Sequence, residues 1–133
     1  MDLEQSAIKR ICQDLGLPVG DSYTQDWIYE LPMKYRNTES LPRYASAYAN
    51  PEYGENEKRL LMQLMLDITN ELLETDDVAG ERAWETVAAL LRKDLKLHRD
   101  QIEYWAMPDK PLEEAFNLTP LVRRFRVSSS IPR

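Results

Sequence analysis

The chain has 133 residues, of which 43% are hydrophobic and 30% are charged, and its formal net charge at pH 7 is −6. This length and composition predict one globular domain over residues 1–133 and argue against a disordered chain. The acidic balance disfavours a general nucleic-acid binder, and no apolar stretch approaches the roughly 20 residues that span a membrane. With one cysteine and no secretion signal at the N-terminus, the expected location is cytoplasmic.

The first predicted helix covers residues 2–15. Its apolar residues recur at three- and four-residue spacing, which indicates one buried stripe. Gly16 can form a left-handed cap after it, and Pro18 opposes its continuation. No neighbouring base favours a reactive thiolate at Cys12, so we expect a buried core cysteine. The stripe consists of Leu3, Ala7, Ile8, Ile11, Cys12 and Leu15.

Residues 19–56 are less regular and contain six of the seven tyrosines. The segment around Trp27 is either a short extended piece or one helical turn, because Pro32 blocks a longer helix. Ser40 is a suitable N-cap for a helix over 41–49. The tyrosines are expected to be half-buried packing residues, although tyrosine is also frequent at protein interfaces.

The clearest helix covers residues 57–73. Its apolar face is broad enough to predict a central helix that other elements contact from more than one side. The inward residues are Leu60, Leu61, Leu64, Met65, Ile68 and Leu72. Polar residues recur on the opposite side at steps of four, three and four, and we expect them to face solvent. They are Gln63, Asp67, Asn70 and Glu74.

Further helical segments follow, so the expected fold is all-α, a compact single domain of five or more helices. Ile102 and Trp105 are expected to be buried, and Thr119 is expected to cap the last segment. Residues 128–133 look like a tail. The predicted elements are helices over 80–93 and 98–106, and short helical segments over 111–117 and 120–126.

Catalytic and metal-binding motifs are missing. The four scattered glycines build no phosphate loop, and one histidine with one cysteine cannot form a zinc site, so no metal or cofactor is expected. His98 is the candidate general base, but among charged neighbours at the start of a helix we expect it on the surface or at a cap. Arg123, Arg124 and Arg126 either contact phosphate, or stabilise a helix C-terminus and pair with acidic neighbours.

The acidic residues are concentrated in one part of the chain. Residues 52–77 contain eight acids and two bases, which accounts for the whole net charge of −6. This segment is either a solvated helix face or a docking surface for a basic partner. The candidate partner-binding residues are Glu52, Tyr53, Glu55, Asp67, Glu71, Glu74, Asp76 and Asp77.

The order of several short stretches, spread over about residues 25–125, is also informative. They are EKRLLMQLM at 57–65, Trp84 with Leu90-Leu91, Leu97-His98 with Ile102-Glu103-Tyr104-Trp105, and FNLTPLVR at 116–123. This succession resembles small helical proteins encoded beside bacterial polymorphic toxins, including the immunity proteins of contact-dependent inhibition and Rhs systems. The resemblance implies a cytosolic antidote that binds a toxin domain and blocks it.

Together with the charge, the resemblance predicts a non-enzymatic immunity protein, monomeric before binding. Its expected partner is a cognate toxin domain, basic and nuclease-like, whose active site it covers without itself contacting nucleic acid or membrane. Tyr53 is a candidate aromatic anchor. Reversing Asp67, Glu71 and Glu74 to lysine is expected to leave the fold intact. Two alternatives stay open: a helical adaptor or regulator with an unrelated partner, and a small hydrolase whose site combines scattered acids with His98.

Overall fold

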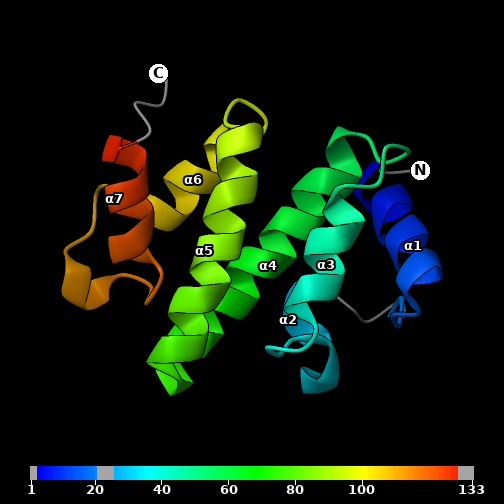
Figure 1. Ribbon diagram of the computed structural model, residues 1–133, viewed down its shortest axis with the longest axis horizontal. Helices are drawn as coiled ribbons and strands as arrows, with labels where there is room; N and C mark the ends of the chain where they lie inside the picture. The colour runs from blue at the N-terminus through cyan, green and yellow to red at the C-terminus, as the bar shows by residue number, and fades with distance from the viewer. Residues whose placement is uncertain (1–2, 21–25, 129–133) are drawn as a thin grey trace.

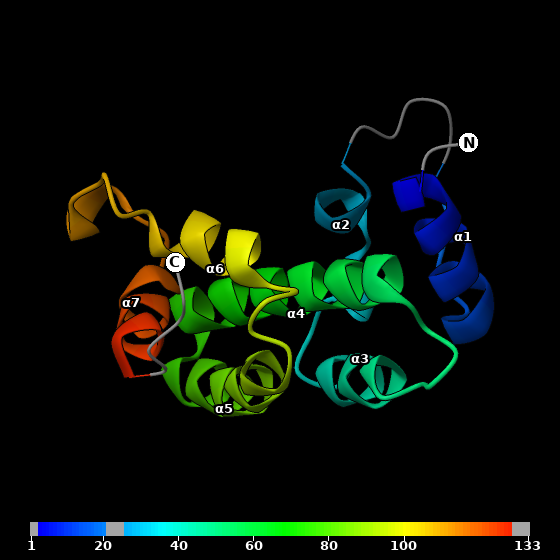
Figure 2. The same cartoon turned by 90° about the horizontal axis from the view of Figure 1, so that it is seen from above.

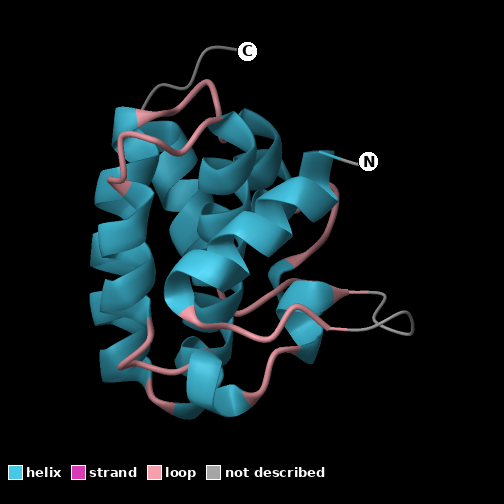
Figure 3. Cartoon of the chain, turned by 90° about the vertical axis from the view of Figure 1, so that its right-hand side faces the viewer, coloured by secondary structure: helices cyan, strands magenta, loops and turns pink. Residues whose placement is uncertain are grey.

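A 21-residue helix, α4 (Glu55–Thr75), runs through the middle of the molecule, and the other helices pack around it (Figure 1). The computed structural model describes residues 3–20 and 26–128. Within these ranges every regular element is helical and there is no strand (Figure 3), which confirms the predicted all-α fold. None of the helices in these ranges is both long and apolar enough to cross a membrane.

The helices form layers on either side of α4, which lies in the middle when the molecule is seen from above (Figure 2). Helices α2 and α6 lie on one side of it and helices α3 and α5 on the other, while α1 and α7 lie towards its two ends. The prediction of a central helix contacted from more than one side is confirmed. The remaining elements are α1 (Leu3–Leu15), α2 (Trp27–Glu30), α3 (Leu41–Tyr48), α5 (Asp77–Lys93), α6 (Arg99–Ala106), α7 (Thr119–Ser128) and the 3₁₀ turns at Met33–Tyr35 and Leu112–Glu114.

Helix α4 is central because apolar side chains cover most of its circumference. It is two residues longer at each end than the predicted 57–73. At its start the Gly54 N–H donates to the Glu57 carboxylate (3.4 Å), which satisfies one of the free donors of a helix N-terminus. Its buried residues are Leu60, Leu61, Met62, Leu64, Met65, Leu66, Ile68 and Thr69.

Asp76 alone separates α4 from α5. Its carboxylate accepts a hydrogen bond from the N–H of Ala79 (3.2 Å) and so caps α5. The predicted start of this helix at residue 80 is wrong, because Asp77 is already its first residue. The tight turn brings Gly80 against α4, where an added Cβ would lie only 2.7 Å from Leu73 Cδ2.

The predicted apolar stripe of α1 faces the core. Gly16 follows the helix with φ +70, as a left-handed cap requires. Cys12 is buried as expected, and this burial raises the pKa of its thiol to about 11. Asp2 and the side chain of Leu3 lie outside the described part of the chain. The buried members of the stripe are Ala7, Ile8, Ile11 and Cys12, with Leu15 partly buried.

The segment at Trp27 forms one helical turn, α2, and not an extended piece. The carboxylate of Asp26 starts this turn by accepting a hydrogen bond from the N–H of Tyr29 (3.2 Å). Ser40 precedes α3 as predicted, but its hydroxyl donates to the carbonyl of Lys34 (3.1 Å) and does not cap the helix.

The C-terminal segment is joined to α6 by side-chain hydrogen bonds. Thr119 is not the cap that we expected, since it is the first residue of α7 and its hydroxyl donates to the carbonyl of Trp105 (2.7 Å). The guanidinium of Arg123 donates to the carbonyls of Ala106 (2.7 Å) and Met107 (2.5 Å) at the end of α6. The expectation that these arginines stabilise a helix C-terminus is confirmed for Arg123.

Two predicted segments near the C-terminus change their extent. Only Leu112–Glu114 of the predicted segment 111–117 is helical, as a 3₁₀ turn. Ser128, predicted as the first residue of a tail, is the last residue of α7. The rest of the predicted tail, 129–133, lies outside the described residues.

Candidate binding groove

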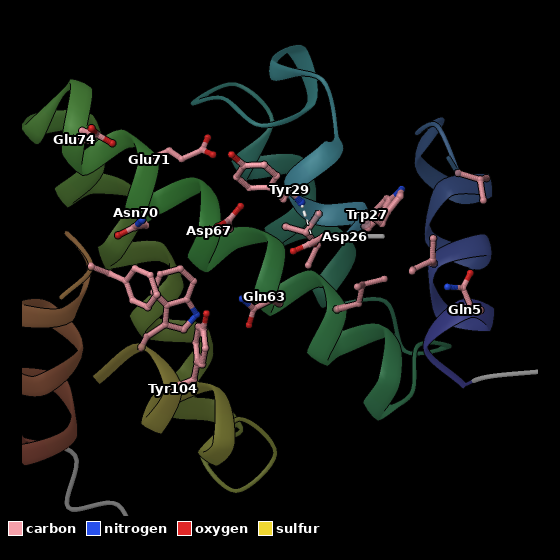
Figure 4. A pocket seen from close by; sticks show the side chains of 16 residues that line it. Gln5, Asp26, Trp27, Tyr29, Gln63, Asp67, Asn70, Glu71, Glu74 and Tyr104 are labelled. Carbon is pink, nitrogen blue, oxygen red and sulfur yellow. Dashed lines mark hydrogen bonds between the residues drawn. The ribbon is translucent and has the colours of Figure 1, made fainter. Parts of the chain in front are cut away.

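A groove of about 840 Å³ lies along α4, between the N-terminal helices and α6 (Figure 4). This volume falls in the range of about 300–1,000 Å³ that is typical of ligand-binding clefts. The floor belongs to α4 and consists of Leu60, Gln63, Asp67, Asn70, Glu71 and Glu74. One wall is formed by Gln5, Ile8, Val19 and residues 26–29, and the other by Tyr104, Trp105 and Phe116.

The polar floor follows from the helical spacing of the α4 sequence. Residues three and four apart share one face of a helix, so Gln63, Asp67, Asn70 and Glu74 form a row on the side that α2 and α6 leave partly open. Of the two interpretations of this face, a solvated surface or a docking surface, full exposure to solvent holds only for Glu74. Glu74 is exposed, whereas the other three side chains are half-buried in the groove.

Arg36 joins the acids of the floor to the segment after α2. One of its terminal nitrogens, Nη1, lies 2.7 Å from Glu71 Oε1 and 3.4 Å from Asp67 Oδ2. Its guanidinium also lies over the ring of Tyr29, 5.9 Å from the ring centroid. Reversing Asp67 and Glu71 to lysine would place two cations beside this buried arginine. The structure therefore removes the basis for expecting those reversals to leave the fold intact.

The Asp67 carboxyl is difficult to ionise in this position. Burial is the main cause that raises its pKa, from 3.8 to about 6, and the neighbouring charge of Glu71 adds to the rise. Arg36 opposes the rise but does not cancel it. The cluster of Asp67, Glu71 and Arg36 thus holds two acids and one cation, and carries surplus negative charge near neutral pH.

In the part of the chain that the structure describes, two polar atoms of groove-lining residues are buried and have no hydrogen-bond partner, and Arg36 Nε, next to the groove, is a third such atom. One is the acceptor Glu71 Oε2, whose companion Oε1 is bound by Arg36. The other is the donor Trp105 Nε1, which belongs to a side chain only 3% exposed. Buried polar groups without partners are rare, and each has a free-energy cost of about 1–3 kcal/mol. The groove lining therefore offers one unmatched acceptor and one unmatched donor.

Two tyrosines that were not among the predicted binding residues lie on opposite sides of the acidic floor (Figure 4). Tyr29 in α2 is 69% exposed, and Tyr104 in α6 is 59% exposed. Tyr104 contacts the Trp105 and Phe116 rings, with centroids 5.5 and 5.7 Å away. The sequence could have indicated the exposure of Tyr104. It directly precedes the predicted core residue Trp105, and adjacent residues of a helix point to different sides.

The remaining predicted site residues do not line the groove. Tyr53 is buried, and its hydroxyl donates to Asp14 (2.6 Å), so it is not the accessible anchor that we expected. Glu52, near the start of α4, lies 3.6 Å from Arg10. Glu55 opens α4, and Asp76 and Asp77 stand at its far end. Of the eight predicted residues, the structure brings three together in the groove, which are Asp67, Glu71 and Glu74.

His98 occupies the N-cap position of α6, in line with the expectation of a capping residue, but its side chain makes no capping hydrogen bond and does not lie on the surface. It is fully buried, with Nε2 at 2.6 Å from the Tyr48 hydroxyl and Nδ1 at 2.7 Å from Gln101 Oε1. Burial lowers its pKa, which the contact with Gln101 and the charge of Asp94 oppose. Both ring nitrogens already have partners, so neither is free to act on a substrate in this conformation.

The part of the chain that the structure describes contains no group of three or more His, Cys, Asp or Glu side chains placed to hold a metal ion. Comparisons with protein-family models, curated proteins and solved structures find no significant match. The fold and the groove therefore define the class of protein by themselves: a small all-α protein with an acidic, aromatic-walled groove on its central helix. The resemblance to immunity proteins stays a prediction.

Proposed function

We propose that the protein is a binding module that captures a basic segment of a partner protein in this groove. The observation that carries the proposal is the acidic floor of α4 with exposed tyrosines on both sides. Negative charge attracts a basic partner and raises its association rate, while tyrosines supply the contact area that charge alone does not. The unpartnered buried atoms of Glu71 and Trp105 support the proposal, because they give an occupant an acceptor and a donor to bind.

We further propose that the partner is a toxin domain, nuclease-like, and that this protein is its cytoplasmic antidote, monomeric before binding. Support comes from the residue pattern that resembles immunity proteins and from the chemistry of nucleases, whose active sites attract phosphate and are therefore basic. An acidic groove matches such a surface. Capture there covers the toxin's substrate site, so neutralisation needs no chemistry by the antidote itself.

The two alternative functions use other features. An adaptor or regulator can use the same groove, but its partner has no toxicity to relieve. A hydrolase based on His98 has little support, because that imidazole is fully buried between Tyr48 and Gln101.

The test expresses the polypeptide encoded next to this chain's gene in a bacterial host, with and without the chain, and measures growth. We expect growth arrest that wild-type chain relieves. Glu74→Lys should abolish the relief, because it reverses an exposed floor charge. Glu85→Lys is the matched control, since Glu85 is an exposed acid on α5 that does not line the groove.

Binding of the two purified proteins over a range of salt concentrations completes the test. The affinity of wild type and of the Glu85→Lys control should fall steeply with salt, and that of Glu74→Lys should be lower and less salt-dependent. A neighbouring polypeptide that is harmless, or one that stays toxic with the chain present, refutes the antidote assignment. Equal affinity of all three forms refutes the groove as the docking site.

A further inference from the structure

One guanidinium, that of Arg36, is already bound beside the groove by residues of the groove lining. Arg36 donates to both Glu71 Oε1 and Asp67 Oδ2 and lies over the ring of Tyr29. Carboxylates with an aromatic face are the surroundings that suit a planar guanidinium, which both forks onto oxygens and stacks on rings. The structure thus contains an internal example of the ligand chemistry that this surface accepts.

The single positive charge of Arg36 does not balance the two carboxylates of Asp67 and Glu71 beside it. Arg36 balances one of the two carboxylates beside it, and Glu71 Oε2 accepts no hydrogen bond. Glu74 lies one helical step further along the same floor, is exposed, and adds a further negative charge. A second cation with N–H donors meets both needs, because it supplies charge to the floor and a donor to the unpartnered oxygen.

The unpartnered N–H donor of Trp105 restricts which chemical class of cation can bind in the groove. Trp105 Nε1 needs an acceptor, and a protonated polyamine or a bare metal ion has none to offer. A peptide has a carbonyl oxygen beside every side chain. Because Trp105 is almost fully buried and lines the same groove as Glu71, the two unmatched atoms together call for an acceptor and a cationic donor in one ligand.

We propose that the specific ligand of the groove is an arginine within a peptide segment, whose guanidinium donates to Glu71 Oε2 and whose backbone carbonyl accepts from Trp105 Nε1. This inference rests on the proposed function, since it specifies the residue of the basic partner that enters the groove. The aromatic side chains of Tyr29, Tyr104 and Phe116 favour guanidinium over ammonium, because guanidinium is less strongly hydrated and stacks.

The experiment titrates isolated, ¹⁵N-labelled protein with short capped peptides and follows the indole N–H resonances by NMR. The probes are acetyl-Gly-Arg-Gly-amide, its lysine counterpart, its citrulline counterpart, which has the same shape without the charge, and spermidine. Comparison with Trp105→Phe assigns the Trp105 resonance. We expect the arginine peptide to move it downfield, as a newly hydrogen-bonded N–H does, and to bind about tenfold more tightly than the other three probes.

Variants separate the two contacts. Glu71→Gln keeps an oxygen for Arg36 but replaces the free acceptor with an amide donor, and should weaken the arginine peptide about tenfold or more. Trp105→Phe should weaken it as well, while the preference for arginine over lysine remains. Glu85→Gln, outside the groove, should bind as wild type. Circular dichroism and thermal melting of each variant show whether it is folded, and the indole shift itself, once assigned, is measured on the wild-type protein.

Equal binding of the arginine and lysine peptides, tighter binding of spermidine, or an unmoved Trp105 resonance at saturation each overturns the arginine assignment. The titration uses the chain alone, so these failures leave the antidote proposal standing. A chain that binds the arginine peptide as expected but relieves no toxicity refutes the antidote proposal instead and supports the ligand assignment.

Discussion

Replacement of Asp67 by asparagine should stabilise the protein, and by an amount that depends on pH. The pKa of this carboxyl is 3.8 in the unfolded chain and about 6 in the folded protein. Folding therefore favours the protonated form, and the stability that this contributes is fully present below about pH 4 and lost as pH rises through 6. Above that range the ionised group costs about 3 kcal/mol relative to its protonated form.

Asparagine resembles the protonated carboxyl, keeps an oxygen for Arg36 and has no charge to desolvate. Because the side chain is 21% exposed, solvent screening reduces the effect. We expect the free energy of unfolding of Asp67→Asn to exceed that of wild type by about 2 kcal/mol at pH 8, and to equal it near pH 4.

Urea unfolding of both proteins at pH 4, 5, 6, 7 and 8 measures this difference directly. Glu85→Gln serves as the control, since this exposed acid on α5 should give the same small difference at every pH. A difference between Asp67→Asn and wild type that does not change with pH would show that the carboxyl is not desolvated. A difference that shrinks as pH rises would show that Arg36 dominates, with a lowered pKa.

Three further predictions concern the core. Leu64→Ala should lower the free energy of unfolding by roughly 2–5 kcal/mol, because the side chain is fully buried in α4; chemical denaturation measures this. Gly80→Ala should lower it by about 1–3 kcal/mol, since the new methyl would meet both the side chain and the backbone N of Leu73, and a wild-type melting temperature would contradict this packing. Cys12 should react with a thiol reagent only as fast as the protein unfolds, because it is buried and its pKa is raised to about 11; reaction at the rate of a free thiol would contradict its burial.

The helices were predictable because their apolar residues recur with the helical period over many turns. In α4, Leu64 and Ile68 belong to a pattern so broad that only a helix contacted from several sides can bury it, and both are fully buried. Helix ends were less accurate, since they depend on single side chains with several possible partners. Asp76 ends one helix by capping the next, while Ser40 and Thr119 bind carbonyls of other segments and cap nothing.

The groove was only partly predictable, because it is assembled from segments distant in sequence. Helical spacing put Asp67 and Glu74 on one face, but nothing in the sequence placed Arg36 beside that face or Tyr104 across from it. The position of His98 was not predictable because it, too, depends on a contact between segments distant in sequence. The charged residues next to it in the sequence suggested solvent, whereas in the fold its ring lies against the hydroxyl of Tyr48 in α3, 50 residues away in the sequence.

The residues that line the groove are not those that would give the folded protein the greatest stability. A pair of half-buried carboxylates with a single arginine is generally less favourable than apolar residues of similar size, and here one acid resists ionisation. An arriving guanidinium changes this balance: it favours the ionised form of Asp67 and gives Glu71 Oε2 the donor that it lacks. These two contacts therefore contribute free energy to binding that the groove residues do not gain from one another. Below about pH 6, where Asp67 takes up a proton, the attraction weakens, so the same carboxyl that destabilises the free protein links its affinity for a cation to pH.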